Sequence, residues 1–216
     1  HWNDHRVGPS MSCDSFRPSS PRWFFLPGPR GRGFFYLLAL GCCALLSGCG
    51  SAALQDHAIK SPEMRPETFF TGFLTAHGVV RDRRGAAIRQ FNADISACWN
   101  DGVGTLDEDF VFDDGEVQKR VWTLSPSTNQ RFIATAGDVV GEGEGRWNGS
   151  AFVLDYTLRI QLEDGAVDVR VDDRMYRVSD DVVVNQSKMS KFGVGVGEIL
   201  LTIIRHPDVE VECAPK

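Results

Sequence analysis

A cationic and an aromatic side chain one residue apart could bind a ligand inside a β-sheet protein. Arg120 and Trp122 would project from the same face of a strand, opposite Lys119 and Val121. A guanidinium in that position could anchor a ligand carboxylate or phosphate. If the face is buried, the charge needs a partner, and we expect Glu108 to supply it. The alternative, which the sequence favours, is a structural plug at the closed end of a barrel.

A second group of candidates shares alternate spacing on two later segments. Its members are Asp172, Arg174, Tyr176, Asn185, Ser187 and Met189. On the first segment the opposite face carries Asp173, Met175 and Arg177, and we expect one of these two faces to point inward. A few polar groups in an apolar cavity are typical of a ligand pocket. Cross-strand pairs on an outer wall are an equally consistent interpretation.

Other chemistry-bearing patterns are weaker. The carboxylates between Asp107 and Glu116 could attract calcium, but alternate residues of a strand lack the geometry of a calcium loop, so we expect a solvated acidic hairpin. No histidine has zinc-site spacing, and no serine has a base beside it. The glycines of 141–145 and 193–197 follow no strand-to-helix pattern and indicate bulges or bends. We therefore predict no metal, no cofactor and no catalytic residue.

The elements that must position these side chains are strands. Between Phe91 and Trp99, apolar residues occupy alternate positions. Further strands are predicted at 72–81, 104–112, 117–124, 131–137, 141–147, 151–162, 166–178, 182–189 and 197–206. Turn-forming pairs separate several of them: Arg84-Gly85, Asp101-Gly102, Asp114-Gly115, Asn148-Gly149 and Asp164-Gly165.

About ten strands joined by short hairpins must pair antiparallel. Closure into an up-and-down β-barrel removes the exposed edges of such a sheet, and we prefer it to a two-sheet sandwich. The predicted fold class is therefore all-β. A proline at a helix-start position predicts one short helical turn over Pro66–Phe70.

Composition places the chain among globular proteins and argues against nucleic acid as a partner. The 216 residues are 42% hydrophobic and 24% charged, as in an ordinary folded domain. The net charge of −6 offers no basic face for phosphates.

The first 49 residues resemble the signal peptide of a bacterial lipoprotein. Arg30 and Arg32 precede an apolar run from Phe34 to Leu46, which is shorter than the roughly 20 residues of a membrane-spanning helix. The run ends in Leu46-Ser47-Gly48-Cys49, a lipobox-like sequence. We expect lipidation of Cys49 and anchoring to a membrane. The long stretch before Arg30 indicates that the true start lies downstream of His1.

The remaining chain divides into three parts. Residues 50–66 read as a flexible tether, 67–208 as the barrel domain and 209–216 as a C-terminal tail. Cys98 and Cys213 are the cysteines left after processing and lipidation. An oxidising compartment would permit a disulfide, but we expect a buried free Cys98 and an unpaired tail cysteine.

Four stretches carry a family resemblance: Thr105–Leu124, Asp138–Gly145, Asp172–Tyr176 and Asn185–Gly193. Together they resemble a bacterial lipoprotein family known as domain of unknown function 3833, over about residues 63–206. The resemblance implies a lipocalin-like barrel and a lipobox, and it carries no established catalytic residues. Gly50 rather than aspartate after the lipidated cysteine resembles lipoproteins sent to the outer membrane.

These observations predict a non-catalytic lipoprotein of the cell envelope, anchored to the outer membrane and facing the periplasm. Its barrel would bind a hydrophobic or lipid-like small molecule. One alternative is a structural or interaction lipoprotein with a filled barrel. Another is an enzyme that uses interior carboxylates on a lipid-like substrate.

Overall fold

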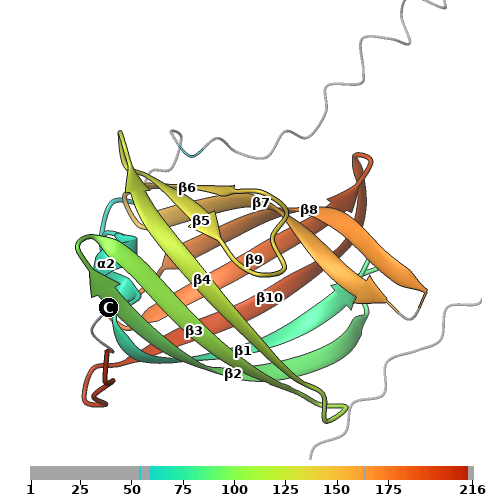
Figure 1. Cartoon of the computed structure of the whole chain (residues 1–216), viewed down its shortest axis with the longest axis horizontal. Coiled ribbons are helices and arrows are strands. Elements are labelled where there is room, and N and C mark those ends of the chain that lie inside the picture. Colours follow the sequence, from blue (N-terminus) through green and yellow to red (C-terminus); the bar gives the residue numbers. More distant parts are fainter. Residues whose placement is uncertain (1–53, 55–58, 163, 214–216) are drawn as a thin grey trace, which may run out of the picture. The chain divides into compact units, whose positions relative to one another are not determined.

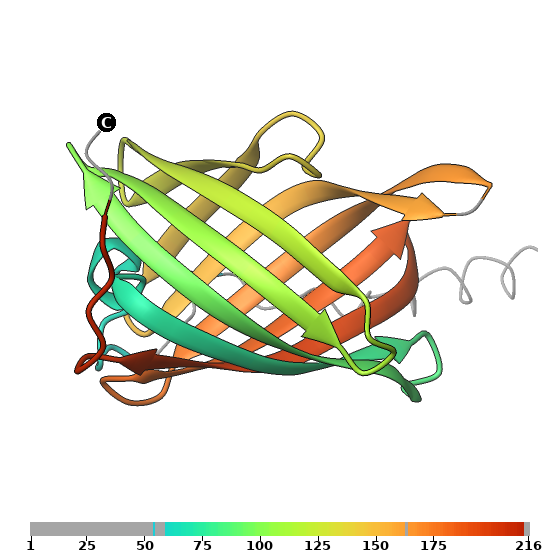
Figure 2. The same ribbon diagram turned by 60° about the horizontal axis from the view of Figure 1, so that its bottom comes forward.

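Ten antiparallel strands close into a barrel in the computed structural model, which describes Leu54, residues 59–162 and residues 164–213. The strands are β1 (Gly72–Asp82), β2 (Ala87–Asn100), β3 (Val103–Phe112), β4 (Val117–Ser127), β5 (Arg131–Thr135), β6 (Gly143–Asn148), β7 (Ala151–Leu162), β8 (Gly165–Arg177), β9 (Val182–Lys191) and β10 (Val194–His206). Each pairs with its neighbours in sequence, and β1 pairs with β10 to close the barrel (Figure 1 and Figure 2). The predicted up-and-down barrel is confirmed, and the sandwich alternative is wrong.

The barrel forms because apolar and polar side chains alternate along strands that tight turns connect. In β2, Phe91, Ala93, Ile95 and Ala97 face the interior, and each is 5% exposed or less. Burying one face and leaving the other wet fixes the register, since a slip of one residue would exchange the two faces. The β3–β4 turn contains Gly115 at φ +85°, a left-handed conformation that favours glycine.

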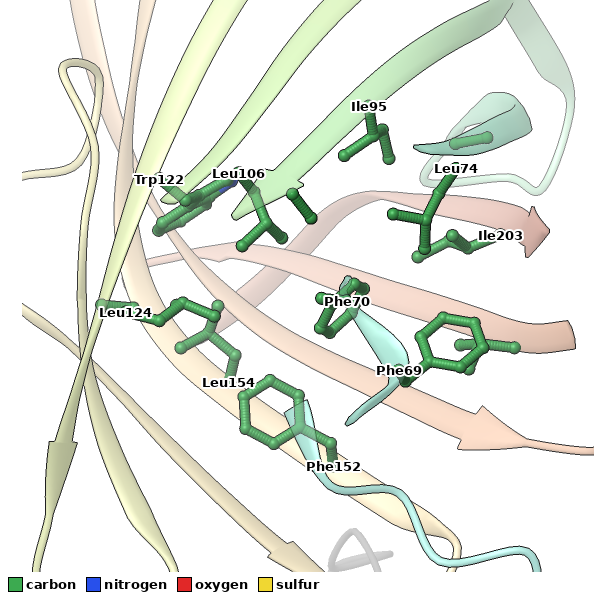
Figure 3. Close-up of a cluster of buried hydrophobic side chains, with 14 of the residues drawn as sticks. Phe69, Phe70, Leu74, Ile95, Leu106, Trp122, Leu124, Phe152, Leu154 and Ile203 are labelled. Atoms are coloured by element: carbon green, nitrogen blue, oxygen red, sulfur yellow. The ribbon is translucent and has the colours of Figure 1, made fainter. Parts of the chain in front are cut away.

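A short helix, α2 (Pro66–Phe69), lies at one end of the barrel (Figure 1). The helical turn predicted from the proline is confirmed. Phe69 is fully buried and Phe70 is 3% exposed, and their rings meet edge to face at 5.3 Å. Figure 3 shows both rings among strand side chains that include Leu74 and Phe152. We call residues 64–70 the plug, because they fill this end with apolar side chains.

The wall between β4 and β7 is only partly built from strands. β4 pairs with the short β5 only over residues 123–127, so its first half lies beside the β5–β6 loop, residues 136–142. This loop follows β7 instead, and the Val140 N–H donates to the Thr157 carbonyl at 2.9 Å. The strand predicted at 141–147 accordingly begins at Gly143.

Residues 59–66, which the sequence assigned to the tether, pack against the barrel. Met64 is fully buried, and its N–H donates to the carbonyl of Gly149 at 2.7 Å. The Ser150 N–H donates to the carbonyl of Ile59 at 3.1 Å. The folded domain therefore begins by Ile59, eight residues before the predicted boundary. Met64 is a single apolar residue among polar residues and prolines, so no hydrophobic periodicity in the sequence predicted this packing.

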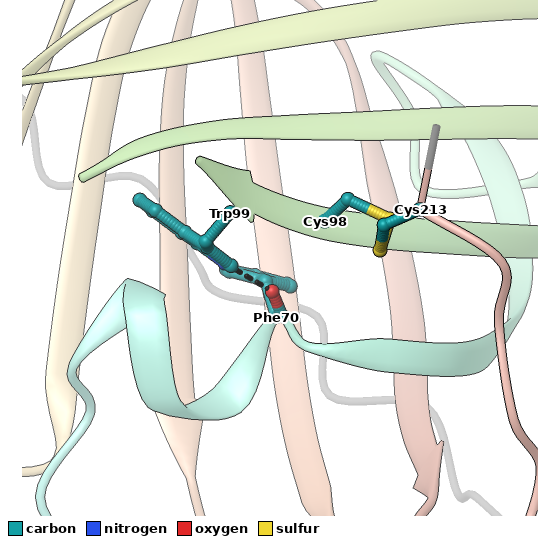
Figure 4. Close-up of a disulfide and its surroundings, with 4 residues drawn as sticks. All are labelled: Phe70, Cys98, Trp99 and Cys213. Carbon is teal, nitrogen blue, oxygen red and sulfur yellow. Dashed lines mark hydrogen bonds between the residues drawn. A yellow bond between two sulfur atoms is a disulfide. The ribbon is translucent and has the colours of Figure 1, made fainter. Parts of the chain in front are cut away.

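The two cysteines of the described domain form a disulfide, which corrects the expectation of unpaired thiols. Cys98 on β2 bonds Cys213 in the C-terminal tail, with the Cα atoms 5.6 Å apart (Figure 4). Ala97 faces the interior, so Cys98 points outward, where the returning tail can reach it. On the adjacent residue, the Trp99 indole N–H donates to the Phe70 carbonyl at 2.6 Å and ties the plug to β2.

The predicted signal peptide, Cys49 and the tether residues 50–53 and 55–58 lie outside the described residues. Within the described part of the chain, no helix is long and apolar enough to cross a membrane.

Candidate functional site

An internal cavity of about 110 Å³ lies in the barrel, lined mainly by apolar side chains. Leu106, Trp122, Leu124 and Leu154 form part of its wall (Figure 3), and Phe70 of the plug bounds it as well. The wall also carries a polar cluster, which consists of Glu108, Arg120, Tyr156, Asp173, Asn185 and Ser187. Polar groups inside an apolar cavity are expensive to bury, so their contacts indicate what the cavity can do.

Arg120 forms an ion pair with Asp138 of the β5–β6 loop. Its Nε donates to Oδ2 at 2.9 Å, and a terminal guanidinium nitrogen donates to the same oxygen at 2.6 Å. Burial disfavours the charged guanidinium, but the Asp138 hydrogen bonds and the nearby acids outweigh it and raise the pKa of Arg120. Glu108 lies directly opposite Arg120 in the β3–β4 register, yet the predicted ion pair with Glu108 is not formed.

Among the residues that the structure describes, Glu108 has no ion-pair partner. It retains accessible surface because it lines the cavity, while the surrounding protein keeps bulk water away. This desolvation raises its pKa from 4.5 to about 7. The positive charge of Arg120 opposes the shift, and the negative charges of Asp173 and Asp138 add to it. Glu108 therefore takes up and releases protons near neutral pH.

Asp173 is a second buried carboxyl group, on β8, and is only 7% exposed. One of its oxygens, Oδ1, accepts hydrogen bonds from the Ser187 hydroxyl at 2.8 Å and from the Asn185 amide. Desolvation raises its pKa to about 6, although these two hydrogen bonds oppose the shift. Among the residues that the structure describes, Oδ2 has no hydrogen-bond partner.

Tyr156 of β7 completes the polar cluster. Its ring meets Trp122 edge to face, with the ring centroids 5.2 Å apart and the planes at 85°. Burial and the negative charges of the nearby carboxylates raise the pKa of its hydroxyl, so the hydroxyl stays protonated. Within the described part of the chain this hydroxyl has no hydrogen-bond partner.

Four of the sequence candidates line the cavity and four do not. Arg120, Trp122, Asn185 and Ser187 lie in its wall. The other four are Asp172, Arg174, Tyr176 and Met189.

The first three of those four lie on the outer face of β8. Asp172 pairs in register with the exposed Lys188, and Arg174 donates to Asp172 at 2.9 Å. Their alternate neighbours Asp173 and Met175 face the cavity instead. Residues 172–176 carry charges on both faces, but the alternation of Val167, Val169 and Val171 with charged residues earlier in β8 marks the face of Asp173 as the inner one.

Met189 lies farther along the barrel from the cavity. It packs against a small apolar cluster of Leu158, Val169 and Val171. The position therefore faces inward, as predicted, but contributes to packing rather than to the cavity wall.

Asp173 and Tyr156 are the residues that sequence analysis missed as site candidates. Asp173 lies on the face of β8 opposite the candidates Asp172, Arg174 and Tyr176. Tyr156 is the only polar residue among the inward-facing apolar residues of β7. A single polar residue in the buried phase of an apolar strand is the signal that could have identified it.

The acidic hairpin of β3 and β4 carries the carboxylates that could attract calcium. Its outer carboxylates instead pair with cations: Asp109 accepts from Lys119 at 3.2 Å, and Glu116 accepts from Arg89 at 2.6 Å. No group of three or more potential metal ligands occurs among the described residues.

Comparison with protein families places the chain in a known group. A family model described as "Protein of unknown function (DUF3833)" matches residues 43–205. The chain belongs to this family. No curated protein matches the sequence. The DUF3833 match covers all ten strands of the barrel except the last residue of β10.

A solved structure shares the fold of this DUF3833 member. The S-type phycobiliprotein lyase CPES from Guillardia theta aligns with a TM-score of 0.50 and 15% sequence identity, covering 67% of this chain and 94% of the lyase chain. At this identity the likeness shows a lipocalin-like barrel and no more.

Proposed function

We propose that this protein is a membrane-anchored lipoprotein of the cell envelope whose barrel binds a small, mostly apolar ligand without transforming it. The lipocalin-like fold and the internal cavity support ligand binding. Fold alone is a weak basis for function, so the proposal depends on the cavity wall.

The unpartnered polar atoms of the cavity carry the proposal. A core that served only stability would turn its polar groups toward protein partners, whereas these groups face the open space of the cavity, where a ligand can reach them. In the described domain, the Tyr156 hydroxyl and Asp173 Oδ2 have no hydrogen-bond partner, and Glu108 has no ion pair. A ligand with a polar group would satisfy these atoms.

The size of the cavity limits the ligand. At about 110 Å³ it is below the roughly 300–1,000 Å³ of pockets for drug-sized molecules, and an engineered cavity of about 150 Å³ binds benzene. A small ligand, or the slender end of a longer one, fits without moving side chains. The same size favours the alternative of a filled, structural barrel, and the unpartnered polar atoms count against that alternative.

Acid–base catalysis is a second candidate function. Glu108, with a pKa of about 7, and Asp173, with a pKa of about 6, could both exchange protons with a bound molecule near neutral pH. Within the cluster, the Ser187 hydroxyl donates to Asp173 Oδ1 at 2.8 Å, so a hydroxyl with an adjacent carboxylate base supports this second candidate.

Two features support an envelope location. The lipobox-like sequence ending at Cys49 predicts an acylated N-terminus, and Gly50 favours the outer membrane. The Cys98–Cys213 disulfide is typical of proteins that fold in an oxidising compartment such as the periplasm.

Native purification tests ligand binding. The full chain, extracted gently from membranes, is expected to carry a small molecule that native mass spectrometry detects. Extraction in the presence of candidate molecules would also show whether the bound species is released unchanged, as binding requires, or altered, as catalysis requires. A barrel that emerges empty under every mild condition contradicts the proposal.

The anchor is tested separately by substitution. Cys49→Ser is expected to release the protein into the soluble periplasmic fraction, because no acyl chain holds it to the membrane. Cys43→Ser is the matched control, since it changes a cysteine of the predicted signal peptide outside the lipobox position. Membrane retention of Cys49→Ser would refute the anchor.

A further inference from the structure

We propose that the cavity selects a ligand with a primary ammonium group on an apolar body, and that Glu108 and Asp173 bind this ammonium. The inference rests on the proposed binding function and names the chemical class of the ligand. It differs from the expectation that Arg120 anchors an anionic head group.

The charge balance of the cluster leaves an excess of carboxylates. Arg120 is the cation of the cavity wall, and Asp138 already neutralises it through a 2.6 Å hydrogen bond. Glu108 and Asp173 remain, on strands β3 and β8, without a cationic partner in the described domain. A ligand cation would supply the missing positive charge.

The directions of the hydrogen bonds point to the same ligand. The hydrogen-bond donors of Ser187 and Asn185 both reach Asp173 Oδ1, which leaves Oδ2 as an acceptor. Glu108 and the oxygen of Tyr156 offer further acceptor positions in the same wall. An ammonium group has three donors and no acceptor, which complements a wall of acceptors.

Two aromatic rings of the wall also favour a cation. Trp122 and Tyr156 meet edge to face at 5.2 Å, and both line the cavity beside the two carboxyl groups. A cation near an aromatic face is attracted by its electrons, most strongly where water is excluded. The remaining wall, including Leu106 and Ile203, is apolar and would contact the body of the ligand.

An anionic head group would be repelled. A ligand carboxylate would approach Glu108 and Asp173, while Arg120 donates its hydrogen bonds to Asp138. Binding such a ligand would require breaking the ion pair with Asp138 or protonating both interior acids.

Binding should depend on pH. Glu108 faces Arg120 and Trp122 of β4, Asp173 of β8 and Asp138 of the β5–β6 loop. Asp173 faces Asn185 and Ser187 of β9, and the charges of Arg120 and Asp172 reach it. Desolvation raises the pKa of both acids, to about 7 and about 6. Below these values they are protonated and lose their attraction for an ammonium, so affinity falls as the pH drops from 8 to 5.

The test uses probes of equal length and the full chain carrying Cys49→Ser, so that no acyl chain competes for the cavity. Butylamine, butanol and butyrate are titrated, and binding is followed by the NMR signal of the Trp122 indole N–H. At pH 8 we expect butylamine to bind about tenfold more tightly than butanol, and butyrate more weakly than either. At pH 5 the advantage of butylamine over butanol should disappear.

Isosteric variants identify the groups involved. Glu108→Gln and Asp173→Asn are each expected to weaken butylamine binding about tenfold at pH 8 and to leave butanol binding within about threefold. Asp109→Asn and Asp172→Asn are the matched controls, because these neighbours lie on the outer face of the same strands. They should leave the binding of both probes unchanged.

The outcomes separate this inference from the proposed function. Equal binding of butylamine and butanol, or tightest binding of butyrate, would overturn the ammonium inference while a bound ligand still supports the binding function. Binding of butylamine that Glu108→Gln and Asp173→Asn leave unchanged would overturn the assignment of these two carboxylates. If no probe binds, the ammonium inference fails, and the native mass spectrum decides the binding function independently.

Discussion

At the scale of single residues, Glu108 and Asp173 hold the chemistry of the interior. Burial raises the pKa of each, so ionising either carboxyl group lowers the free energy of unfolding. Groups that weaken the fold and remain in the structure are typical of functional sites. Their neighbours Asp109 and Asp172 lie on the outer face with cationic partners, so one position along a strand separates a costly carboxylate from an ordinary one.

The pH dependence of stability follows from the shift at Glu108. Between its ordinary value of 4.5 and the folded value of about 7, the folded state holds a proton that the unfolded state has released. The free energy of unfolding therefore decreases as the pH rises through this window, by up to roughly 3 kcal/mol. Glu108→Gln should be as stable as the parent at pH 5 and more stable at pH 8 in urea unfolding without ligand.

The control for this prediction is Asp109→Asn, which changes a solvent-exposed carboxylate on the same strand. Its stability should follow that of the parent at both values of pH. If the stability of Glu108→Gln exceeds that of the parent no more at pH 8 than at pH 5, Glu108 is not the buried titrating group that the geometry indicates.

At the scale of elements, the plug and the short strands β5 and β6 shape the cavity. The plug bounds one side through Phe70, and the β5–β6 loop brings Asp138 to Arg120 on the other. Because β5 and β6 are short, this loop rather than a strand lies beside the first half of β4. Glycine at position 145 gives the Phe152 ring room, since a Cβ there would lie 2.7 Å from it.

Removal of a plug ring should destabilise the whole barrel. Phe69 is fully buried, and Phe69→Ala is expected to lower the free energy of unfolding by about 3–5 kcal/mol, because it leaves a cavity at the closed end. Chemical denaturation measures the change. Thr68→Ala, an exposed position on the same helix, should cost less than about 1 kcal/mol. Equal, small effects of both substitutions would show that α2 is not part of the cooperative fold.

At the scale of the whole molecule, the disulfide joins two parts of the chain that are far apart in sequence. Cys98 and Cys213 are separated by 115 residues, so the bond closes a loop that contains most of the barrel. Such a bond restricts the unfolded chain more than the folded one, and a loop of about 100 residues corresponds to about 5 kcal/mol in the chain-entropy description.

Breaking the disulfide should therefore lower stability without changing the fold. Cys213→Ser is expected to reduce the free energy of unfolding by about 2–5 kcal/mol, measured by urea denaturation with far-UV circular dichroism. Cys98→Ser/Cys213→Ser should match the single variant, since both lack the same bond. A reducing agent should weaken the parent to the same extent and leave the variants unaffected. Parent and variants of equal stability would contradict the bond.

The sequence by itself determined the barrel and part of the site. Alternation in segments such as 91–99 and the glycine turns between strands are local signals, and antiparallel closure follows from them. The candidates Arg120, Trp122 and Asn185 lie in the cavity wall, but the sequence left their direction open, because their strands also carry valines that the structure exposes on the outer face.

Only the tertiary structure decided which polar groups meet. Asp173 continues the inward series Val167, Val169 and Val171 of β8, and the register with β9 then brings Ser187 opposite it, which no pattern within one strand could show. Asp138 replaced Glu108 as the partner of Arg120 because the short β5 and β6 place a loop beside β4. Alternation fixes where a side chain points relative to its neighbours along a strand. Contacts between distant segments depend on how those segments pack, which no local pattern records.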